Sequence, residues 1–178
     1  LNNSGNILTA VGDYQNALAA YSECLDLTAE KNNQPEKALR SKAFINALRV
    51  SLYLSDNLKT GMMLREAVDH VHQVTDTSAQ ANNLIALARL MMEIRRADLP
   101  GGGLQPEPDL TGMIYKALTE ADRIALELSN HRLVSCSKGY LGTLYESENR
   151  VEEALQLTRS AIFYGRQGDY PDILYQWQ

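Results

Sequence analysis

The sequence is poor in cysteine and histidine, and both shortages narrow the chemistry open to it. Its two cysteines, Cys24 and Cys136, can form at most one disulfide, and each falls on the apolar stripe of a predicted helix. This placement favours two buried thiols over a disulfide. The three histidines are His70, His72 and His131. Because His70 and His72 are two positions apart, they face different sides of a helix, so we expect no metal site.

The chain also lacks a basic cluster and a long apolar run. Lysine and arginine number 17 against 22 aspartates and glutamates, and they form no stripe along the chain. A protein that binds nucleic acid needs such a stripe to displace counterions from phosphates. No stretch of about 18 apolar residues is present, and no signal peptide is visible. We therefore expect neither a nucleic-acid partner nor a membrane partner; the compartment stays open, with the cytoplasm favoured.

Catalytic motifs are absent too. The run 101–103 is three glycines, but a phosphate-binding loop also needs a lysine and a strand-to-helix junction, and neither is near. His131 and Cys136 are five positions apart, which places them about 140° apart around a helix. They are therefore poorly placed for a catalytic pair. The sequence predicts no catalytic residue, no cofactor and no enzyme activity.

What the sequence does contain is an internal repeat. Two sets of residues, one near each end of the chain, share the spacing 3, 9, 4 and 3: Gly5, Leu8, Ala17, Tyr21 and Cys24, and then Gly142, Tyr145, Ala154, Thr158 and Ala161. A polar turn interrupts each set. Small residues at the first and third positions allow two helices to approach closely. The template therefore predicts an antiparallel helix pair joined by a short turn.

The middle of the chain continues this pattern more loosely. Apolar residues recur at spacings of 3 and 4 over residues 38–54, 57–74, 80–96 and 110–128, as expected for amphipathic helices. Residues 98–109 contain three prolines and three glycines, so we interpret them as an insertion between two helices. Including the short segments at both ends, we expect nine helices. The repeat is already under way at residue 1 and again at residue 178, so we expect a piece of a longer array.

The repeats resemble tetratricopeptide repeats. The run 12–18, Gly-Asp-Tyr-Gln-Asn-Ala-Leu, is similar to that family's turn and second helix, and residues 140–145 with 153–155 are similar to both halves of its motif. The spacing of the small anchors is longer than the usual period of about 34 residues. The resemblance implies an all-α fold over residues 1–178: a right-handed superhelical solenoid of antiparallel helix pairs that binds a protein or peptide.

A narrower resemblance concerns the C-terminal part. Residues 139–146, 153–161 and 174–178 are similar to repeats of bacterial CHAT-domain proteins, in which a tetratricopeptide array precedes a caspase-like peptidase domain. This resemblance implies that the chain is the array without the peptidase. An alternative stays open: the array could be the ligand-sensing regulatory arm of a transcription regulator or an enzyme. The exposed ends of the array are also candidate surfaces for self-association.

A solenoid of this kind binds its partner on the concave face, which the first helix of each pair lines. Asparagine side chains there can pair with an extended peptide backbone, and Arg89 can bind a carboxylate. By the repeat register, the residues predicted to contact a partner are Asn2, Asn6, Thr9, Phe44, Leu48, Ser51, Asn82, Ile85, Arg89, Met92, Thr143 and Glu146.

Overall fold

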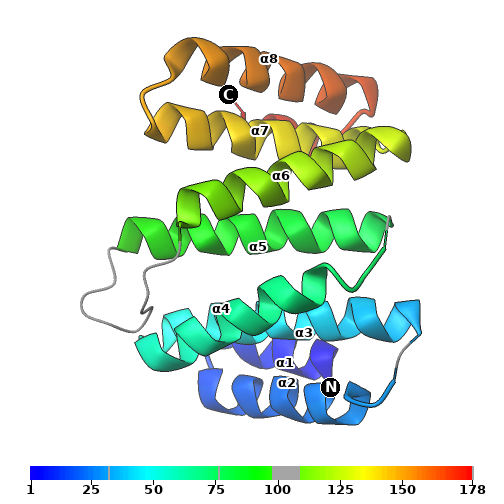
Figure 1. Cartoon of the computed structure of the whole chain (residues 1–178), viewed down its shortest axis with the longest axis vertical. Helices are drawn as coiled ribbons and strands as arrows, with labels where there is room; N and C mark the ends of the chain where they lie inside the picture. The colour runs from blue at the N-terminus through cyan, green and yellow to red at the C-terminus, as the bar shows by residue number, and fades with distance from the viewer. Residues whose placement is uncertain (32, 76, 98–108, 178) are drawn as a thin grey trace. The chain divides into compact units, whose positions relative to one another are not determined.

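The computed structural model describes residues 1–31, 33–75, 77–97 and 109–177. These residues form helices joined by short turns, and none of them lies in a β-strand. The helices in chain order are α1 (Asn2–Ala10), α2 (Tyr14–Thr28), α3 (Gln34–Tyr53), α4 (Asn57–Val71), α5 (Ser78–Ala97), α6 (Leu110–Glu127), α7 (His131–Ser147), α8 (Val151–Gln167) and α9 (Pro171–Leu174) (Figure 1). The prediction of an all-α fold is confirmed.

Side-chain caps explain where most of these helices begin. An aspartate or asparagine at the N-cap accepts a hydrogen bond from a backbone N–H three residues on, which satisfies a donor that the first turn leaves free. Five caps are of this type: Asp13, Asn33, Asp56, Asp109 and Asn130. Several turns also carry a left-handed residue directly before the cap, such as Gly12 with φ 82° and Ser55 with φ 54°. The chain thus reverses direction in very few residues.

The chain divides into two compact units. The N-terminal unit comprises Leu1–Thr75 and Glu93–Pro108, and the C-terminal unit comprises Asp76–Met92 and Asp109–Gln178. Helices α1 to α4 lie in the first, α6 to α9 lie in the second, and α5 contributes to both. Within the described part of the insertion, α5 ends at Ala97 and Asp109 caps α6; residues 98–108 lie outside the described residues.

The core of the N-terminal unit centres on Tyr21. This side chain is 1% exposed, and it packs with Ala17 and Leu18 of α2 and with Ala47 and Val50 of α3. Its ring also lies directly on Gly5 of α1: a Cβ added to Gly5 would come within 2.5 Å of the ring. The small residue in the repeat template therefore makes room for an aromatic ring from the next helix.

In the C-terminal unit the equivalent glycine has the same function. A Cβ on Gly142 of α7 would lie 2.8 Å from Thr158 Oγ1 and 3.2 Å from the carbonyl oxygen of Ala154, both on α8. Ser135 of α7 donates a 2.7 Å hydrogen bond to the carbonyl oxygen of Ala161. The predicted close contact of α7 with α8 is confirmed. Both cysteines are free; Cys24 is buried as predicted, whereas Cys136, which was also expected to be buried, is only partly buried.

No described helix combines the length and the apolar character needed to cross a bilayer.

Candidate partner-binding site

Three asparagines form a polar cluster between α1 and α3. Asn46 Nδ2 donates to Asn2 Oδ1 at 3.2 Å and to Asn6 Oδ1 at 3.0 Å. Asn6 Oδ1 also accepts a 2.8 Å hydrogen bond from the hydroxyl of Tyr21. The buried Tyr21 ring therefore connects the cluster to the core of this unit. Arg49 Nη1 lies 3.5 Å from Asn46 Oδ1. We call Asn2, Asn6, Asn46 and Arg49 the asparagine cluster.

The cluster presents hydrogen-bond donors to solvent. Asn6 is exposed; its oxygen accepts two hydrogen bonds, and its Nδ2 group donates to none of the described residues. Arg49 is half-buried, and its guanidinium forms no ion pair within the described part of the chain. Side-chain amides and guanidinium groups together donate to oxygen acceptors. The cluster is therefore suited to carbonyl or carboxylate oxygens of a ligand.

A second polar surface lies on the C-terminal unit. The guanidinium carbon of Arg89, on α5, is 5.3 Å from the ring centroid of Tyr140, on α7. Tyr140 in turn meets the indole of Trp177 edge-on, with ring centroids 5.1 Å apart. That indole lies on Gly139, where an added Cβ would come within 2.4 Å of it. Arg89 is exposed and pairs with no described carboxylate, so it can bind an anionic group.

Cys136 lies on the same helix as Tyr140 and is partly buried. Burial raises the pKa of its thiol, although the nearby positive charges of Arg132 and Arg89 oppose this rise. The thiol is therefore in its neutral form at neutral pH, which is the less nucleophilic form. His131 contacts the ring of Tyr164 instead, with centroids 5.7 Å apart. The arrangement gives no support to a cysteine–histidine pair.

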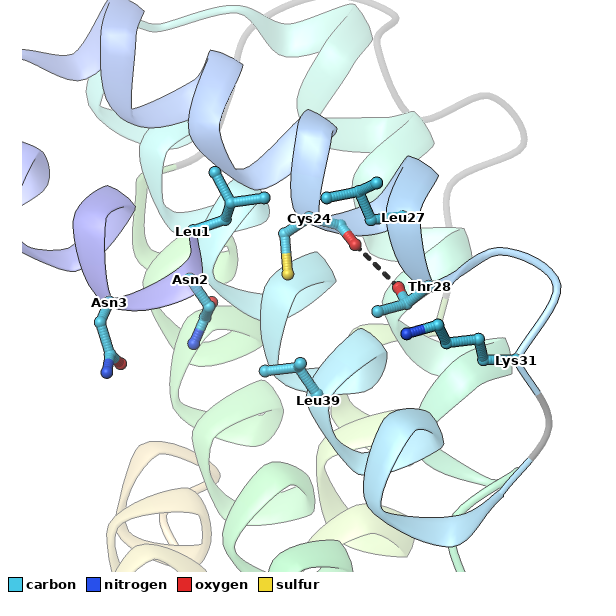
Figure 2. A pocket seen from close by; sticks show the side chains of 8 residues that line it. All are labelled: Leu1, Asn2, Asn3, Cys24, Leu27, Thr28, Lys31 and Leu39. Atoms are coloured by element: carbon cyan, nitrogen blue, oxygen red, sulfur yellow. Dashed lines mark hydrogen bonds between the residues drawn. The ribbon is translucent and has the colours of Figure 1, made fainter.

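A pocket of about 340 Å³ opens beside α1, α2 and α3 in the N-terminal unit (Figure 2). Its lining is mainly apolar, and Lys31 lies at one side: Leu1, Asn2, Asn3, Cys24, Leu27, Thr28, Lys31 and Leu39. Thr28 Oγ1 donates to the carbonyl oxygen of Cys24 at 2.8 Å, so this hydroxyl is already satisfied within its helix. The pocket is thus mainly apolar, and Asn2 connects it to the asparagine cluster.

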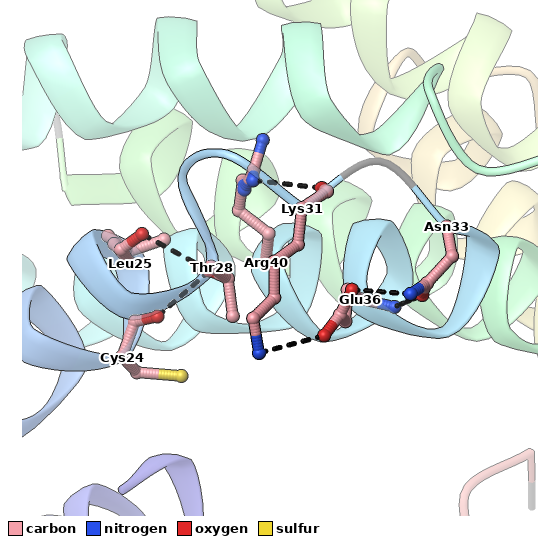
Figure 3. A network of polar contacts seen from close by, with 7 residues as sticks. All are labelled: Cys24, Leu25, Thr28, Lys31, Asn33, Glu36 and Arg40. Atoms are coloured by element: carbon pink, nitrogen blue, oxygen red, sulfur yellow. Dashed lines mark hydrogen bonds and ion pairs between the residues drawn. The ribbon is translucent and has the colours of Figure 1, made fainter.

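The turn beside this pocket is held by a network of polar contacts (Figure 3). Lys31 Nζ pairs with Glu36 Oε1 at 3.0 Å, and Glu36 also contacts the capping residue Asn33. Arg40 Nη2 donates to the carbonyl oxygen of Lys31 at 3.2 Å. Arg40 is 8% exposed, and its Nε has no hydrogen-bond partner among the residues that the structure describes. The network fixes the connection of α2 to α3, which is a structural function.

The structure distributes the predicted contact residues over surface and core. Seven are exposed or half-buried: Asn6, Thr9, Phe44, Asn82, Arg89, Thr143 and Glu146. Five are buried: Asn2, Leu48, Ser51, Ile85 and Met92. Of these, Ser51 accepts a 3.0 Å hydrogen bond from Thr60 of α4, and the half-buried Phe44 packs against His70 of the same helix. The structure brings Asn2 and Asn6 together, as well as Thr9, whose hydroxyl lies 3.2 Å from that of Tyr21.

The sequence prediction missed Asn46, Arg49 and Tyr140, which complete these two surfaces. A signal for Asn46 was present: it is a polar residue next to the small anchor Ala47, and it lies 40 positions after Asn6, close to the repeat spacing. Within the described residues, no group of three histidine, cysteine or acidic side chains could hold a metal ion. No known protein family matches this chain, and a comparison with curated proteins found no match.

Proposed function

We propose that this chain is a protein-interaction scaffold of tetratricopeptide type, which binds an extended segment of a partner protein on its first helices. The asparagine cluster carries the proposal. Its amide and guanidinium donors lie on α1 and α3, and an extended peptide offers carbonyl oxygens at regular intervals. On the C-terminal unit, Arg89 beside Tyr140 offers a separate donor for an oxygen acceptor. The motif of residues 139–146 supports the further proposal that the scaffold is the repeat region of a CHAT-type protein.

A buried network beneath exposed donors favours binding over a purely structural function. The oxygen of Asn6 is held by both Tyr21 and Asn46, so the orientation of its free amide group is fixed before a ligand arrives. A donor that is already oriented loses little conformational entropy on binding. An asparagine that served only to connect α1 to α3 would have no need to be exposed.

The test is a selection of unstructured peptides from a random phage-displayed library, followed by affinity measurement with the best synthetic peptide. We expect Asn6→Ala and Arg49→Ala each to weaken binding by at least about tenfold, because truncating an interface anchor often costs about 2 kcal/mol or more. The controls are Glu23→Ala and Glu152→Ala, exposed residues of α2 and α8, and we expect them to bind as the unmodified chain does. Circular dichroism verifies folding.

Equal losses in all four variants would place the binding surface elsewhere. A library that yields no enriched peptide would contradict the proposal itself.

A further inference from the structure

A second cavity, of about 520 Å³, lies in the C-terminal unit. It opens where the first turn of α6 meets the last turn of α7 and the start of α8. Its lining is aromatic in the centre and charged at the edges: Asp109, Thr111, Gly112, Tyr115, Leu144, Tyr145, Glu148 and Arg150. A cavity of this size accommodates a long side chain. None of these residues belongs to the asparagine cluster or to the Arg89–Tyr140 surface.

Two tyrosines form the wall of this cavity. The ring centroids of Tyr115 and Tyr145 are 6.4 Å apart, and Tyr115 is 45% exposed. The guanidinium carbon of Arg150 lies 4.1 Å from the ring centroid of Tyr145. The chain itself thus stacks a guanidinium on one of the two rings, while the other ring remains accessible. The negative face of an aromatic ring attracts such cations.

The charges of the cavity favour a cation. Arg150 is already paired, since its Nε and Nη2 donate to Glu153 Oε1 at 3.0 and 2.7 Å. This contact lowers the pKa of the Glu153 carboxyl, so both partners stay ionised. Asp109 Oδ1 accepts from the backbone N–H of Gly112 at 2.9 Å, whereas its Oδ2 has no partner among the described residues. Because Glu153 offsets the charge of Arg150, the charge that Asp109 brings to the lining is negative and favours a cation.

We infer that this cavity binds an arginine side chain of the partner protein. The guanidinium stacks on Tyr115 and donates to Asp109 Oδ2, and the methylene groups of the side chain lie against Leu144. A charge-assisted hydrogen bond and a cation–π contact then act on the same planar group. The inference rests on the proposed function in one respect: the arginine belongs to a partner protein. The cavity itself is independent of the asparagine cluster, since the two belong to different units.

The experiment titrates the isotope-labelled chain with acetyl-Gly-Arg-Gly-amide and follows the backbone amide resonances. We expect saturable shifts at Gly112 and Tyr145, and binding that weakens as sodium chloride is added. The same peptide with citrulline in place of arginine keeps the shape but loses the charge, and we expect it to bind about tenfold more weakly. Equal binding of the citrulline peptide would overturn the inference.

Asp109→Asn provides the matched variant. Asparagine caps a helix as well as aspartate does, so α6 is preserved while the negative charge is removed. We expect this variant to lose about tenfold in affinity for the arginine peptide. Asp13→Asn makes the same change at the cap of α2, far along the sequence from this cavity, and should bind like the unmodified chain. Unchanged binding by Asp109→Asn would overturn the inference.

Tyr115→Leu tests the contribution of the aromatic ring without changing the N-cap residue Asp109. It also provides the test if the Asp109→Asn variant fails to fold. The loss of the ring is expected to weaken binding of the arginine peptide and to leave the weak binding of the citrulline peptide nearly unchanged. A Tyr115→Leu variant that binds the arginine peptide normally would also overturn the inference. If the arginine peptide does not bind at this cavity but the phage-selected peptides bind at the asparagine cluster, the inference is wrong and the proposed function is unaffected.

Discussion

Replacing Gly142 with leucine is expected to lower the free energy of unfolding by about 1 to 3 kcal/mol, the usual cost of overpacking a tight contact. A Cβ at this position would lie 2.8 Å from Thr158 Oγ1 and 3.2 Å from the carbonyl oxygen of Ala154. A side-chain hydroxyl can rotate away, but a helix carbonyl cannot. The larger side chain must therefore push α7 from α8.

The measurement is urea unfolding followed by circular dichroism, with Gln156→Leu as the control. Gln156 lies on α8 and is exposed, so the same leucine added there meets no close neighbour and should change stability by less than about 0.5 kcal/mol. If Gly142→Leu unfolds at the same urea concentration as the control, then the contact of α7 with α8 at this point is not tight. The repeat template would lose its physical basis.

The success of the template shows which features of this fold are local. Small residues, polar turns and caps act within one helix pair, so their spacing can be read along the sequence. Pro35 in the first turn of α3 and Asp56 at the cap of α4 lie where such residues stabilise a helix start. Helix boundaries were accordingly predicted to within a few residues, as for 57–74 against Asn57–Val71.

The proposed binding surface was harder to predict because α3, which carries half of it, contacts neighbouring helices on several sides. In α3, Leu48, Val50 and Ser51 are fully buried, so the face on which the repeat register placed two contact residues is covered. Arg49, near the C-terminal end of α3, is half-buried and lies between the buried residues Leu48 and Val50. Buried polar residues such as Asn46 do not follow the hydrophobic period, so the repeat register placed the predicted contacts of α3 a few residues away.

Contacts between segments far apart in the chain could not be predicted from the sequence for a different reason. Trp177 lies on Gly139 and against Tyr140, although nearly forty residues separate them. Such a contact depends on the path of α8 and α9, since no local rule pairs these positions. The accessible ring of Tyr115 and the free oxygen of Asp109 are likewise brought to one cavity only by the packing of α6 on α7.

The contact of Tyr21 with Gly5 leads to a prediction about two substitutions that act together. Tyr21→Ala is expected to cost about 3 to 5 kcal/mol, because it empties a fully buried aromatic site and removes the hydroxyl that holds Asn6. Tyr21→Phe keeps the ring and should cost only about 1 to 2 kcal/mol, the usual effect of a lost hydrogen bond with a polar partner left behind. The difference separates packing from hydrogen bonding.

Gly5→Ala completes the cycle. In the unmodified chain the new methyl group would come within 2.5 Å of the Tyr21 ring, so we expect a loss of about 1 to 3 kcal/mol. In the Tyr21→Ala background the ring is gone, and alanine has the higher helix propensity, so the same substitution should be neutral or stabilising by up to about 1 kcal/mol. Urea unfolding of the four proteins gives the coupling free energy directly. Additive effects would mean that the ring of Tyr21 does not lie on Gly5.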